Sequence, residues 1–481
     1  MIEKNCECCI LGAGPAGLAV SLELTSNNVN DIIIVDKHKI PGGLSRTEIF
    51  DSVRFDVGPH RFFTKNAEVD KIWHDSLGSD FKPVERLTRI LYGNKYFNYP
   101  IKASEALLKL GPATSLKAML SYLLALAGEK KQPLTFEEWV VQNFGEKLYT
   151  IFFKTYTEKV WGIPCNQIGA EWAAQRIKGL DIIEVIKNAL FKGKKNTVKT
   201  LVDQFNYPIL GAGQMYEAML NRSLVNSKVQ VLYNNRVTAI NHKDNTVTSV
   251  DIEGPSSETT KITAKHFFSS IPLTHFFKFL NPAQSDDINK AVDALYYRDH
   301  ITVNILADGD DLFPDQWIYV HSPEVKMARL ANYNNFSRLM VGSKNKTALS
   351  VEYFVFQSDK LWKDKDSDLV ELAGDELNFM GLVNKKAIEK AWVVRETESY
   401  PTYYLGFQEP YEKLRNAVDK FTNLHAIGRG GMYKYNNQDH SIYSGLLGAR
   451  NYLQSDKRYN LWNINIDCEY HEKAEIKETK Q

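Results

Sequence analysis

The sequence of 481 residues lacks two features that would direct it to a membrane or to DNA: a long apolar run and an excess of charge. Its most apolar segment, AMLSYLLALAG at 118–128, is shorter than the roughly 20 residues that a membrane-spanning helix needs. The net charge of +1 gives no field that would attract nucleic acid or an acidic membrane. The first residues have no basic region and no long apolar stretch, so no signal peptide is predicted. We expect a cytoplasmic protein with no nucleic-acid partner and no integral membrane association.

Cysteine is also scarce, with five residues, of which three stand together as Cys6, Cys8 and Cys9. A C-x-C-C cluster lacks the paired spacing of a zinc site, and its neighbours predict an N-terminal strand. We therefore interpret these cysteines as small buried strand residues. Neither a disulfide framework nor a metal site is predicted.

A glycine-rich turn follows this strand. The segment CECCILGAGPAGLAVSLELTSNNVNDIIIVDK predicts a strand, a turn, a helix and a second strand ending at Asp36. Gly12 suits the tight turn, Gly14 lets backbone approach a pyrophosphate, and Gly17 allows the helix to pack closely on the strand. The helix N-terminus can hold phosphates, and Asp36 can accept from a ribose hydroxyl. The alternative is a glycine turn of an ordinary α/β protein, but the complete pattern favours a dinucleotide site.

A second glycine pair, Gly42 and Gly43, lies just beyond Asp36 in the segment IPGGLSRTEIF, with Arg46 nearby. In FAD proteins, backbone of this kind passes close to the diphosphate, whereas NAD domains usually continue into a plain helix. FAD is therefore the predicted cofactor, with Gly43 in its binding site.

The rest of the chain alternates between helical and strand patterns. Apolar residues at three-to-four spacing predict helices over about 104–199, whereas short β-type runs occupy 228–254 and much of 300–400. The predicted fold is α/β, with a discontinuous FAD-binding Rossmann-like domain, a helical insert domain and an antiparallel β-sheet insert domain. The predicted boundaries are 1–103, 200–296 and 413–465 for the FAD-binding domain, 104–199 for the helical substrate and lid domain, 297–412 for the β-sheet substrate domain, and 466–481 for a polar tail.

Several motifs along the chain share their order and approximate spacing with those of one enzyme family. They are GAGPAGL, IPGG, GPHRFFTKN, FNYP, YTEKVWG, QRI, RLANYNNF, YP at 400 and GRGGMYKYNNQDHSI. Over residues 9–450 the chain resembles the flavin-dependent UDP-galactopyranose mutases. The first two motifs also occur in the wider superfamily of amine oxidases and protoporphyrinogen oxidases, whereas YTEKVWG and GRGGMYKY are much more specific.

The resemblance implies an isomerase that interconverts the pyranose and furanose forms of a nucleotide-diphosphate sugar and supplies furanose donors for surface glycans. In this family N5 of reduced FAD attacks the anomeric carbon and expels the diphosphate. The resulting flavin–sugar adduct opens to an iminium, the ring closes through another hydroxyl, and the diphosphate returns. Such covalent catalysis divides one difficult step into two easier ones.

The resemblance also assigns roles to individual residues. Arg176, on a mobile lid, and Arg329 match two arginines that grip the diphosphate and stabilise its developing charge. Tyr400 and Tyr435 match tyrosines that donate to the same phosphates. The matched catalytic residues are Arg176, Arg329, His60 and Tyr435.

The remaining matches line the substrate and the flavin. Tyr156 is implied near the nucleobase and diphosphate, and Phe152, one helical turn earlier, offers a second stacking face. His60 matches the histidine of a flexible loop beside the flavin, and the backbone conformation of that histidine is implied to depend on the redox state of the flavin. The matched substrate-binding residues are Phe152, Tyr156, Trp161, Asn98 and Tyr400, and Arg429 matches an arginine near the flavin.

Each assignment has an ordinary structural alternative. Phe152 fits a hydrophobic core as well as a ligand site, Arg176 fits a surface charge, and His60 after Gly-Pro fits a turn. Arg329 carries more weight because it stands in an otherwise uncharged stretch, MARLANYNN, where a solvated face would be richer in Lys and Glu.

Two departures from the family fall near the sugar and the nucleobase. Phe63 stands where compact bacterial mutases usually have a second histidine, and Asn437 stands where they have an acid. The reaction type is therefore better determined than the substrate, and a 6-deoxy, acetamido or heptose sugar on another nucleotide remains open.

Two competing functions are open on the same superfamily fold. An FAD oxidoreductase of the amine oxidase or protoporphyrinogen oxidase type needs a hydride-donating substrate but no arginines and tyrosines around a diphosphate. A binding protein like the Rab escort proteins would not need the intact glycine fingerprint. No second nucleotide fingerprint is found, so the predicted reductant is transiently bound NAD(P)H or a separate reductase. A homo-oligomer is left open.

Overall fold

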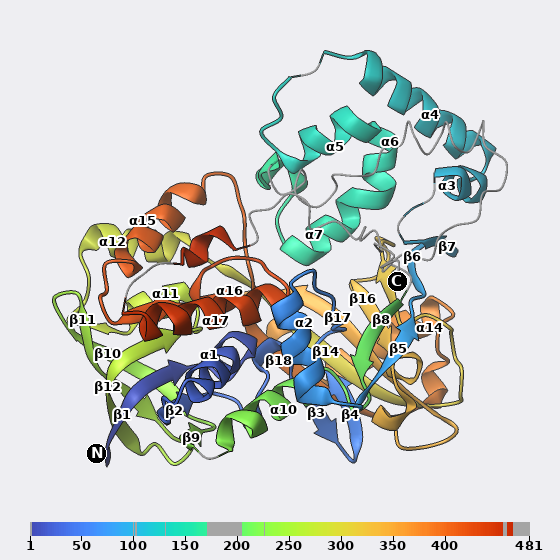
Figure 1. Cartoon of the computed structure of the whole chain (residues 1–481). Coiled ribbons are helices and arrows are strands. Elements are labelled where there is room, and N and C mark those ends of the chain that lie inside the picture. Colours follow the sequence, from blue (N-terminus) through green and yellow to red (C-terminus); the bar gives the residue numbers. More distant parts are fainter. Residues whose placement is uncertain are drawn as a thin grey trace, which may run out of the picture.

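The structure, a computed structural model, describes residues 2–99, 101, 103–129, 131–170, 204–225, 227–455 and 459–464. In this part of the chain two large sheets and a group of helices occupy three regions (Figure 1). The predicted polar tail and the segment around Arg176 lie outside the described residues. None of the described helices is long and apolar enough to cross a membrane.

The first sheet is centred on β1 (Ile2–Leu11), which pairs in parallel with β2 on one side and β12 on the other. The strand order is β13-β10-β11-β12-β1-β2-β9, and β19 pairs with β12. The other strands are β2 (Asp31–Val35), β9 (Lys228–Leu232), β10 (Arg236–Lys243), β11 (Thr246–Glu253), β12 (Thr259–Ser269), β13 (Leu280–Asn281) and β19 (Leu424–Ala426). Because these strands come from distant parts of the chain, the predicted discontinuous Rossmann-like fold is confirmed.

Helices cover this sheet, and α1 (Pro15–Ser26) is largely buried. It is apolar around most of its circumference and packs between β1 and α17 (Gln438–Leu453), which explains why it shows no amphipathic stripe. Cys6, Cys8 and Cys9 are buried in β1, as predicted. The other helices here are α2 (Ala67–Leu77), α10 (Gly213–Leu224), α11 (Leu273–Lys278), α12 (Asp286–Ala294), α15 (Gln408–Val418) and α16 (Gly428–Gly431).

The second sheet has the order β18-β14-β17-β16-β15-β6-β7 and is antiparallel except where β6 pairs with β15. Helix α14 (Asp366–Phe379) packs its apolar side on this sheet, so β14 and β17 are buried on both faces. The strands are β6 (Thr88–Tyr92), β7 (Lys95–Asn98), β14 (Tyr297–Asp308), β15 (Trp317–Val320), β16 (Arg329–Asn332), β17 (Lys346–Val355) and β18 (Ile388–Pro401). Short ribbons are formed by β3 (Thr47–Phe50) with β4 (Val53–Asp56), and by β5 (Phe81–Glu85) with β8 (Gln204–Pro208).

Residues 88–98 belong to the second sheet, whereas the predicted boundaries assign them to the FAD-binding domain. Strands β6 and β7, placed by those boundaries in the FAD-binding domain, extend the second sheet. The pairing of Ile318 with Arg89 joins residues far apart in the sequence, so no local pattern marks it. The β-sheet region therefore uses residues from both sides of the helical insert.

The helical insert stands above the second sheet and is the uppermost region of Figure 1. A capping box at Thr135 and Glu138 begins α5, which fixes the start of the central helix. Lys159 holds the insert to the sheet region because its ammonium donates to three carbonyls, those of Val320, Ser322 and Met327. The elements are α3 (Ala103–Leu110), α4 (Pro112–Ala127), α5 (Phe136–Phe144), α6 (Glu146–Tyr149), a π-helical turn (Thr150–Lys154) and α7 (Thr155–Trp161).

Candidate active site

The turn between β1 and α1 has the backbone that the glycine fingerprint predicts. Gly12 has φ of +109°, and a Cβ there would lie 2.1 Å from Ser270 Oγ. A Cβ on Gly17 would lie 1.9 Å from the carbonyl oxygen of Gly12. Side chains at these positions are therefore excluded, and α1 packs directly against the turn that precedes it.

The second glycine pair lies against this turn. The amide of Gly42 donates to the carbonyl of Ala13 at 2.8 Å, and a Cβ on Gly43 would lie 3.2 Å from the Cα of Gly14. Gly14 is the N-cap of α1 and supplies no side-chain cap to the amides of the first turn. Backbone amides at a helix start, with Gly14 and Gly43 side by side there, form a site that fits a diphosphate.

Asp36 lies at the end of β2 and is buried. Its carboxylate accepts from the amide of Ala13 at 2.6 Å and from the amide of His38 at 2.8 Å. Each carboxylate oxygen can accept two hydrogen bonds, so capacity remains for a ribose hydroxyl. Asp36 therefore holds the glycine turn in place through its hydrogen bond with the amide of Ala13.

A buried ion-pair network joins this cofactor region to the second sheet. Arg46 bonds to Glu48 at 2.8 Å and to Glu396 of β18 at 2.6 Å. Burial raises the pKa of Glu396, but the hydrogen bond from His38 and the charge of Arg46 outweigh it, and the net shift is downward. Glu396 therefore stays ionised, and it anchors β18 to the segment after the glycine pair.

Arg329 occupies the first position of β16, directly opposite Glu352 on β17. Its Nη2 lies 2.5 Å from Glu352 Oε2 and donates to the Tyr400 hydroxyl at 3.3 Å. Burial opposes the charge of Arg329, yet the Glu352 carboxylate outweighs it and raises the pKa. Within the described part of the chain, Arg329 Nε and Glu352 Oε1 are buried with no hydrogen-bond partner. Such unsatisfied polar atoms indicate a site where a polar ligand supplies the missing hydrogen bonds.

Arg429 approaches the same tyrosine from α16. Its guanidinium lies 5.2 Å from the ring centre of Tyr400 and 4.9 Å from that of Tyr435, and these two rings stack at 5.5 Å. Arg429 donates to two backbone carbonyls, those of Ser399 and Asn436. Arg329 and Arg429 therefore meet at Tyr400, and the Glu352 carboxylate pairs with Arg329, so one carboxylate faces two positive charges.

His60 faces both guanidiniums from the loop after β4. Its Nδ1 lies 2.8 Å from the carbonyl oxygen of Gly58, which identifies Nδ1 as the donor and leaves Nε2 as an acceptor. Removal from water, followed by the charge of Arg429, lowers the pKa of His60 to about 3. The imidazole is therefore neutral at physiological pH.

Aromatic side chains from the helical insert form the wall of this cluster. Trp161 stacks on Tyr403 at 6.1 Å and meets Tyr400 and Tyr435 edge-on at 6.4 Å each. Tyr156, one turn earlier on α7, stacks on His321 at 4.8 Å. Burial raises the pKa of Tyr156 well above its ordinary value even though Arg329 lowers it, so its hydroxyl remains a hydrogen-bond donor.

Two of the predicted residues that the structure describes do not join this cluster. Phe152 is buried in a hydrophobic cluster and meets Phe97 edge-on at 5.1 Å. Asn98, at the end of β7, donates to Glu105 of α3 at 2.8 Å, which is its side-chain partner among the described residues. Arg176 lies outside the described residues.

Glu352 and Tyr319 flank Arg329 on the two neighbouring strands, and neither was predicted from the sequence as a site residue. The register of the second sheet places Tyr319 beside Arg329 on the side away from Glu352, and the Tyr319 ring meets that of Tyr156 at 5.4 Å. The signal for Glu352 was present, because an acid within the apolar run TALSVEYFVF predicts a buried ion pair. Tyr319 has no comparable signal. Asn437, one of the departures noted above, is the N-cap of α17.

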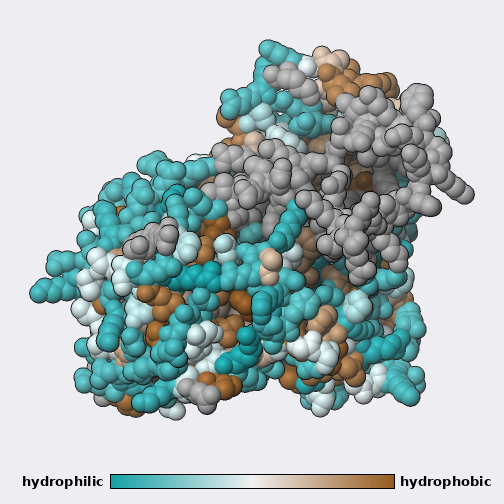
Figure 2. Space-filling model, in the orientation of Figure 1, coloured by the Kyte–Doolittle hydropathy of each residue, from teal (hydrophilic) through white to brown (hydrophobic). Residues whose placement is uncertain are grey.

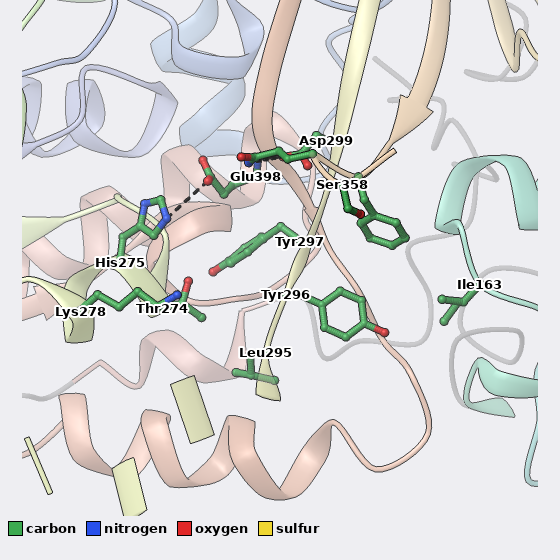
Figure 3. A pocket seen from close by; sticks show the side chains of 12 residues that line it. Ile163, Thr274, His275, Lys278, Leu295, Tyr296, Tyr297, Asp299, Ser358 and Glu398 are labelled. Carbon is green, nitrogen blue, oxygen red and sulfur yellow. Dashed lines mark hydrogen bonds and ion pairs between the residues drawn. The ribbon is translucent and has the colours of Figure 1, made fainter. Parts of the chain in front are cut away.

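A cavity of about 480 Å³ lies where the three regions meet (Figure 3). Its lining includes Ile163 after α7, and His275 Nε2 of α11 lies 3.4 Å from a carboxylate oxygen of Glu398 of β18. Burial raises the pKa of Asp299 to about 6, and its carboxylate accepts from the amide of Glu398 at 2.8 Å. The cavity and the Arg329 cluster thus share strand β18, through Glu398 and Tyr400.

The chain resembles known proteins over part of its length. Residues 10–76 match the family described as the NAD(P)-binding Rossmann-like domain. The chain is 26% identical over 170 residues to a protein named "Probable UDP-galactopyranose mutase" of Klebsiella pneumoniae, and 27% identical over 172 residues to dTDP-fucopyranose mutase of Escherichia coli. Each alignment covers 34% of this chain, and 42% and 43% of those proteins respectively. The chain therefore spans less than half the length of the curated relatives it matches.

Solved structures share the fold over almost the whole chain. The crystal structure of reduced UDP-galactopyranose mutase superposes with a TM-score of 0.81 at 21% identity, covering 93% of this chain and 96% of that one. Putrescine oxidase bound to putrescine gives a TM-score of 0.60 at 13% identity, covering 94% and 100%. The predicted α/β fold and the predicted resemblance to the pyranose mutases are confirmed.

Proposed function

We propose that this protein is a flavin-dependent isomerase that interconverts the pyranose and furanose forms of a nucleotide-diphosphate sugar. The observation that carries the proposal is the meeting of Arg329 and Arg429 at Tyr400. Because the one carboxylate that pairs with them, Glu352, contacts Arg329, the two guanidiniums favour a ligand with at least one negative charge, and a diphosphate supplies it. The furanose product would serve as a donor for surface glycans.

The cofactor we propose is FAD in its reduced form. The backbone at Gly14 and Gly43 fits its diphosphate, and the spare lone pairs of Asp36 fit its ribose. When bound, a reduced flavin supplies a nucleophile for the anomeric carbon at N5, which no side chain of this cluster offers. The predicted reductant, transient NAD(P)H or a separate reductase, belongs to the same proposal.

The arginines would bind the diphosphate and stabilise the charge it gains as the anomeric bond breaks. The free Nε of Arg329 offers a donor that Glu352 does not use, and the hydroxyls of Tyr400 and Tyr435 add neutral donors. These groups are positioned by sheet register and stacking before substrate arrives, so little reorganisation is needed during the reaction. The predicted contribution of Arg176 from the lid belongs to this part of the proposal.

Tyr156 and Trp161 would hold the nucleotide and exclude water on the side of the helical insert. The protonated hydroxyl of Tyr156 can donate to a phosphate or a base, while its ring covers the site. Neutral His60 adds no charge beside the guanidiniums, and its Nε2 can accept from a sugar hydroxyl or from the cofactor. Phe152 and Asn98 would act indirectly, because they support the wall through Phe97 and α3.

The test is conversion of a panel of nucleotide sugars by the dithionite-reduced protein under anaerobic conditions, with pyranose and furanose separated by chromatography. We expect many product molecules for each electron pair supplied, because an isomerisation consumes no reductant. Arg338→Ala is a matched control, since Arg338 is an exposed arginine paired with Asp310 and Asp311. One product per electron pair, or amine oxidation with oxygen uptake, would instead identify an oxidoreductase.

A further inference from the structure

Strand β14 carries a row of polar side chains that solvent hardly reaches. Figure 2 shows hydrophilic residues over much of the lower part of the molecule, where the two sheet regions lie, so polar groups there are mostly at the surface. His300 and Thr302 of β14 are exceptions, since they are at most 4% exposed. The intervening Ile301 and Val303 pack in the core with α14. Because side chains alternate along a strand, His300 and Thr302 point to the opposite face of the sheet.

Two atoms of this row are buried with no hydrogen-bond partner in the part of the chain that the structure describes. They are Nε2 of His300 and Oγ1 of Thr302. Asn304 is the next residue on the same face, and its Oδ1 accepts from the Ser350 hydroxyl at 2.5 Å. The missing partners are therefore confined to one end of the row. Native folds rarely leave buried polar atoms unpaired, so this end of the row indicates a place where a ligand binds.

The register of the second sheet continues the row to the Arg329 cluster. His300 stands opposite Glu396 of β18, and Thr302 stands opposite Glu352 of β17. Glu352 in turn stands opposite Arg329 of β16. Residues directly opposite each other in an antiparallel sheet share a face. The unpaired atoms of β14 therefore lie on the same face as the unpaired Oε1 of Glu352 and Nε of Arg329, and the row crosses three neighbouring strands.

His300 lies between the proposed cofactor site and the two guanidiniums that meet at the far end of the row. Removal from water lowers the pKa of His300 to about 4; the charge of Glu396 opposes this shift, and those of Arg329, Arg46 and Arg429 add to it. The imidazole is therefore neutral at physiological pH. Arg46 follows the glycine pair, whereas Arg329 and Arg429 belong to the substrate side. A cofactor that extends from the glycine turn to these guanidiniums therefore passes His300.

The other nitrogen of the His300 ring determines which hydrogen-bonding role Nε2 has. Nδ1 lies 2.7 Å from the Ser399 hydroxyl, and that hydroxyl donates its one hydrogen to the carbonyl of Glu396 at 3.4 Å. Ser399 can then only accept from His300, which places the ring hydrogen on Nδ1. Nε2 therefore carries a lone pair, and the partner that it lacks is a hydrogen-bond donor.

We propose that Nε2 of His300 accepts a hydrogen bond from the ring of the bound flavin, at the N–H group that the ring has at N5 only when it is reduced. This inference rests on the function proposed above, in which the protein binds reduced FAD. In that function N5 faces the sugar, and the row of unpaired atoms leads from His300 to the arginine that would bind the diphosphate of the same substrate. A neutral acceptor there favours the reduced cofactor without adding a charge beside the guanidiniums.

The first test measures the midpoint potential of the flavin in the holoprotein, in His300→Asn and in His300→Gln by anaerobic spectroelectrochemistry. Asparagine carries its polar atoms as many bonds from Cα as Nδ1, and glutamine as many as Nε2. His300→Asn should therefore keep the contact with Ser399 but lose the one with the flavin. We expect the ratio of the affinities for reduced and oxidised flavin to fall on the order of tenfold, which lowers a two-electron potential by about 30 mV. His300→Gln should restore most of this difference.

The matched control is Asn304→Ala. It removes a buried polar side chain from the same face of the same strand, but one whose partner, Ser350, belongs to the protein. Asn304→Ala should lower the melting temperature, because the Ser350 hydroxyl loses its acceptor, while the potential of the flavin stays at the parental value. A loss of stability and a loss of the contact with the flavin are thereby measured separately.

Three outcomes would overturn the role of His300. They are a parental potential in flavin-loaded His300→Asn, an equal shift in Asn304→Ala, and a failure of His300→Gln to recover any of the shift. If the potential and the flavin affinity of His300→Asn were unchanged but its KM for the nucleotide sugar rose, Nε2 would be assigned to the substrate. A parent protein that contains no flavin would instead refute the proposed function itself.

Discussion

Arg329 offers the sharpest test of the proposed reaction, but alanine is a poor replacement. Glu352 is wholly buried and lies 2.5 Å from Arg329 Nη2. Removing one partner of a buried ion pair typically costs about 3–5 kcal/mol of stability, because the other charge is left uncompensated. Lost activity in Arg329→Ala could therefore reflect unfolding. Arg329→Lys keeps the positive charge beside Glu352 and removes the planar set of donors.

The expected loss follows from the donors that lysine cannot supply. The ammonium can pair with Glu352, but it cannot at the same time reproduce the Nε of Arg329 and the contact with Tyr400 at 3.3 Å. Removing one donor aimed at a developing charge typically lowers kcat by about 100- to 1,000-fold, or roughly 2.7–4 kcal/mol. The flavin should remain bound, since its proposed site is at Gly14 and Gly43, on the first sheet.

The assay measures anaerobic furanose formation by the reduced protein, together with flavin released by acid precipitation and the melting temperature. Arg338→Lys is the matched control, because it makes the same change at a surface position. The double variant Arg329→Ala/Glu352→Ala removes both charges and should be more stable than Arg329→Ala while remaining inactive. If Arg329→Lys kept the parental turnover with its flavin bound, Arg329 would be a structural partner of Glu352 and not part of the reaction.

Three further predictions concern the cofactor, a tyrosine and a histidine. Gly43→Val should lower the flavin absorbance per protein, since a Cβ there already lies 3.2 Å from Gly14 at a φ of +54°; full flavin content would contradict the fit. Tyr400→Phe keeps the ring stack but removes the hydroxyl, so kcat should fall while flavin content stays constant; unchanged kcat would make the contact structural. His60 has a pKa of about 3, below its ordinary 6.5. The unfolded chain therefore binds a proton that the folded chain does not, and stability falls as pH drops from 6.5 toward 3. In His60→Gln the free energy of unfolding, measured by denaturant titration, should depend less on pH in this window, and equal slopes would refute the assignment.

The parts of the site that could be predicted from the sequence are those whose signal is local. The turn at Gly12 and the strand end at Asp36 lie within one short segment, so spacing alone locates the cofactor region. Arg329 was predictable because a charge within an apolar run needs a partner. That partner, Glu352, is set by the register of β16 against β17, and register is a property of the folded sheet. Tyr319 enters the site in the same way, and β6 reaches the second sheet through a pairing that no neighbouring residue indicates.

Strand β18 explains how the proposed cofactor site on the first sheet and the Arg329 cluster on the second sheet are held in fixed relative positions. Glu396 of β18 binds Arg46 beside the glycine turns, and Tyr400 of the same strand contacts Arg329 and Arg429. The pairing of β18 with β14 is bulged between Glu396 and Tyr400, where Glu398 has a φ of 52°, so a short, paired stretch of backbone joins the cofactor turn to the guanidinium pair. Because Glu396 is buried and stays ionised, the anchor holds across the physiological pH range. A ligand gripped at Tyr400 is thereby positioned relative to the proposed flavin by the backbone of one strand rather than by a flexible loop.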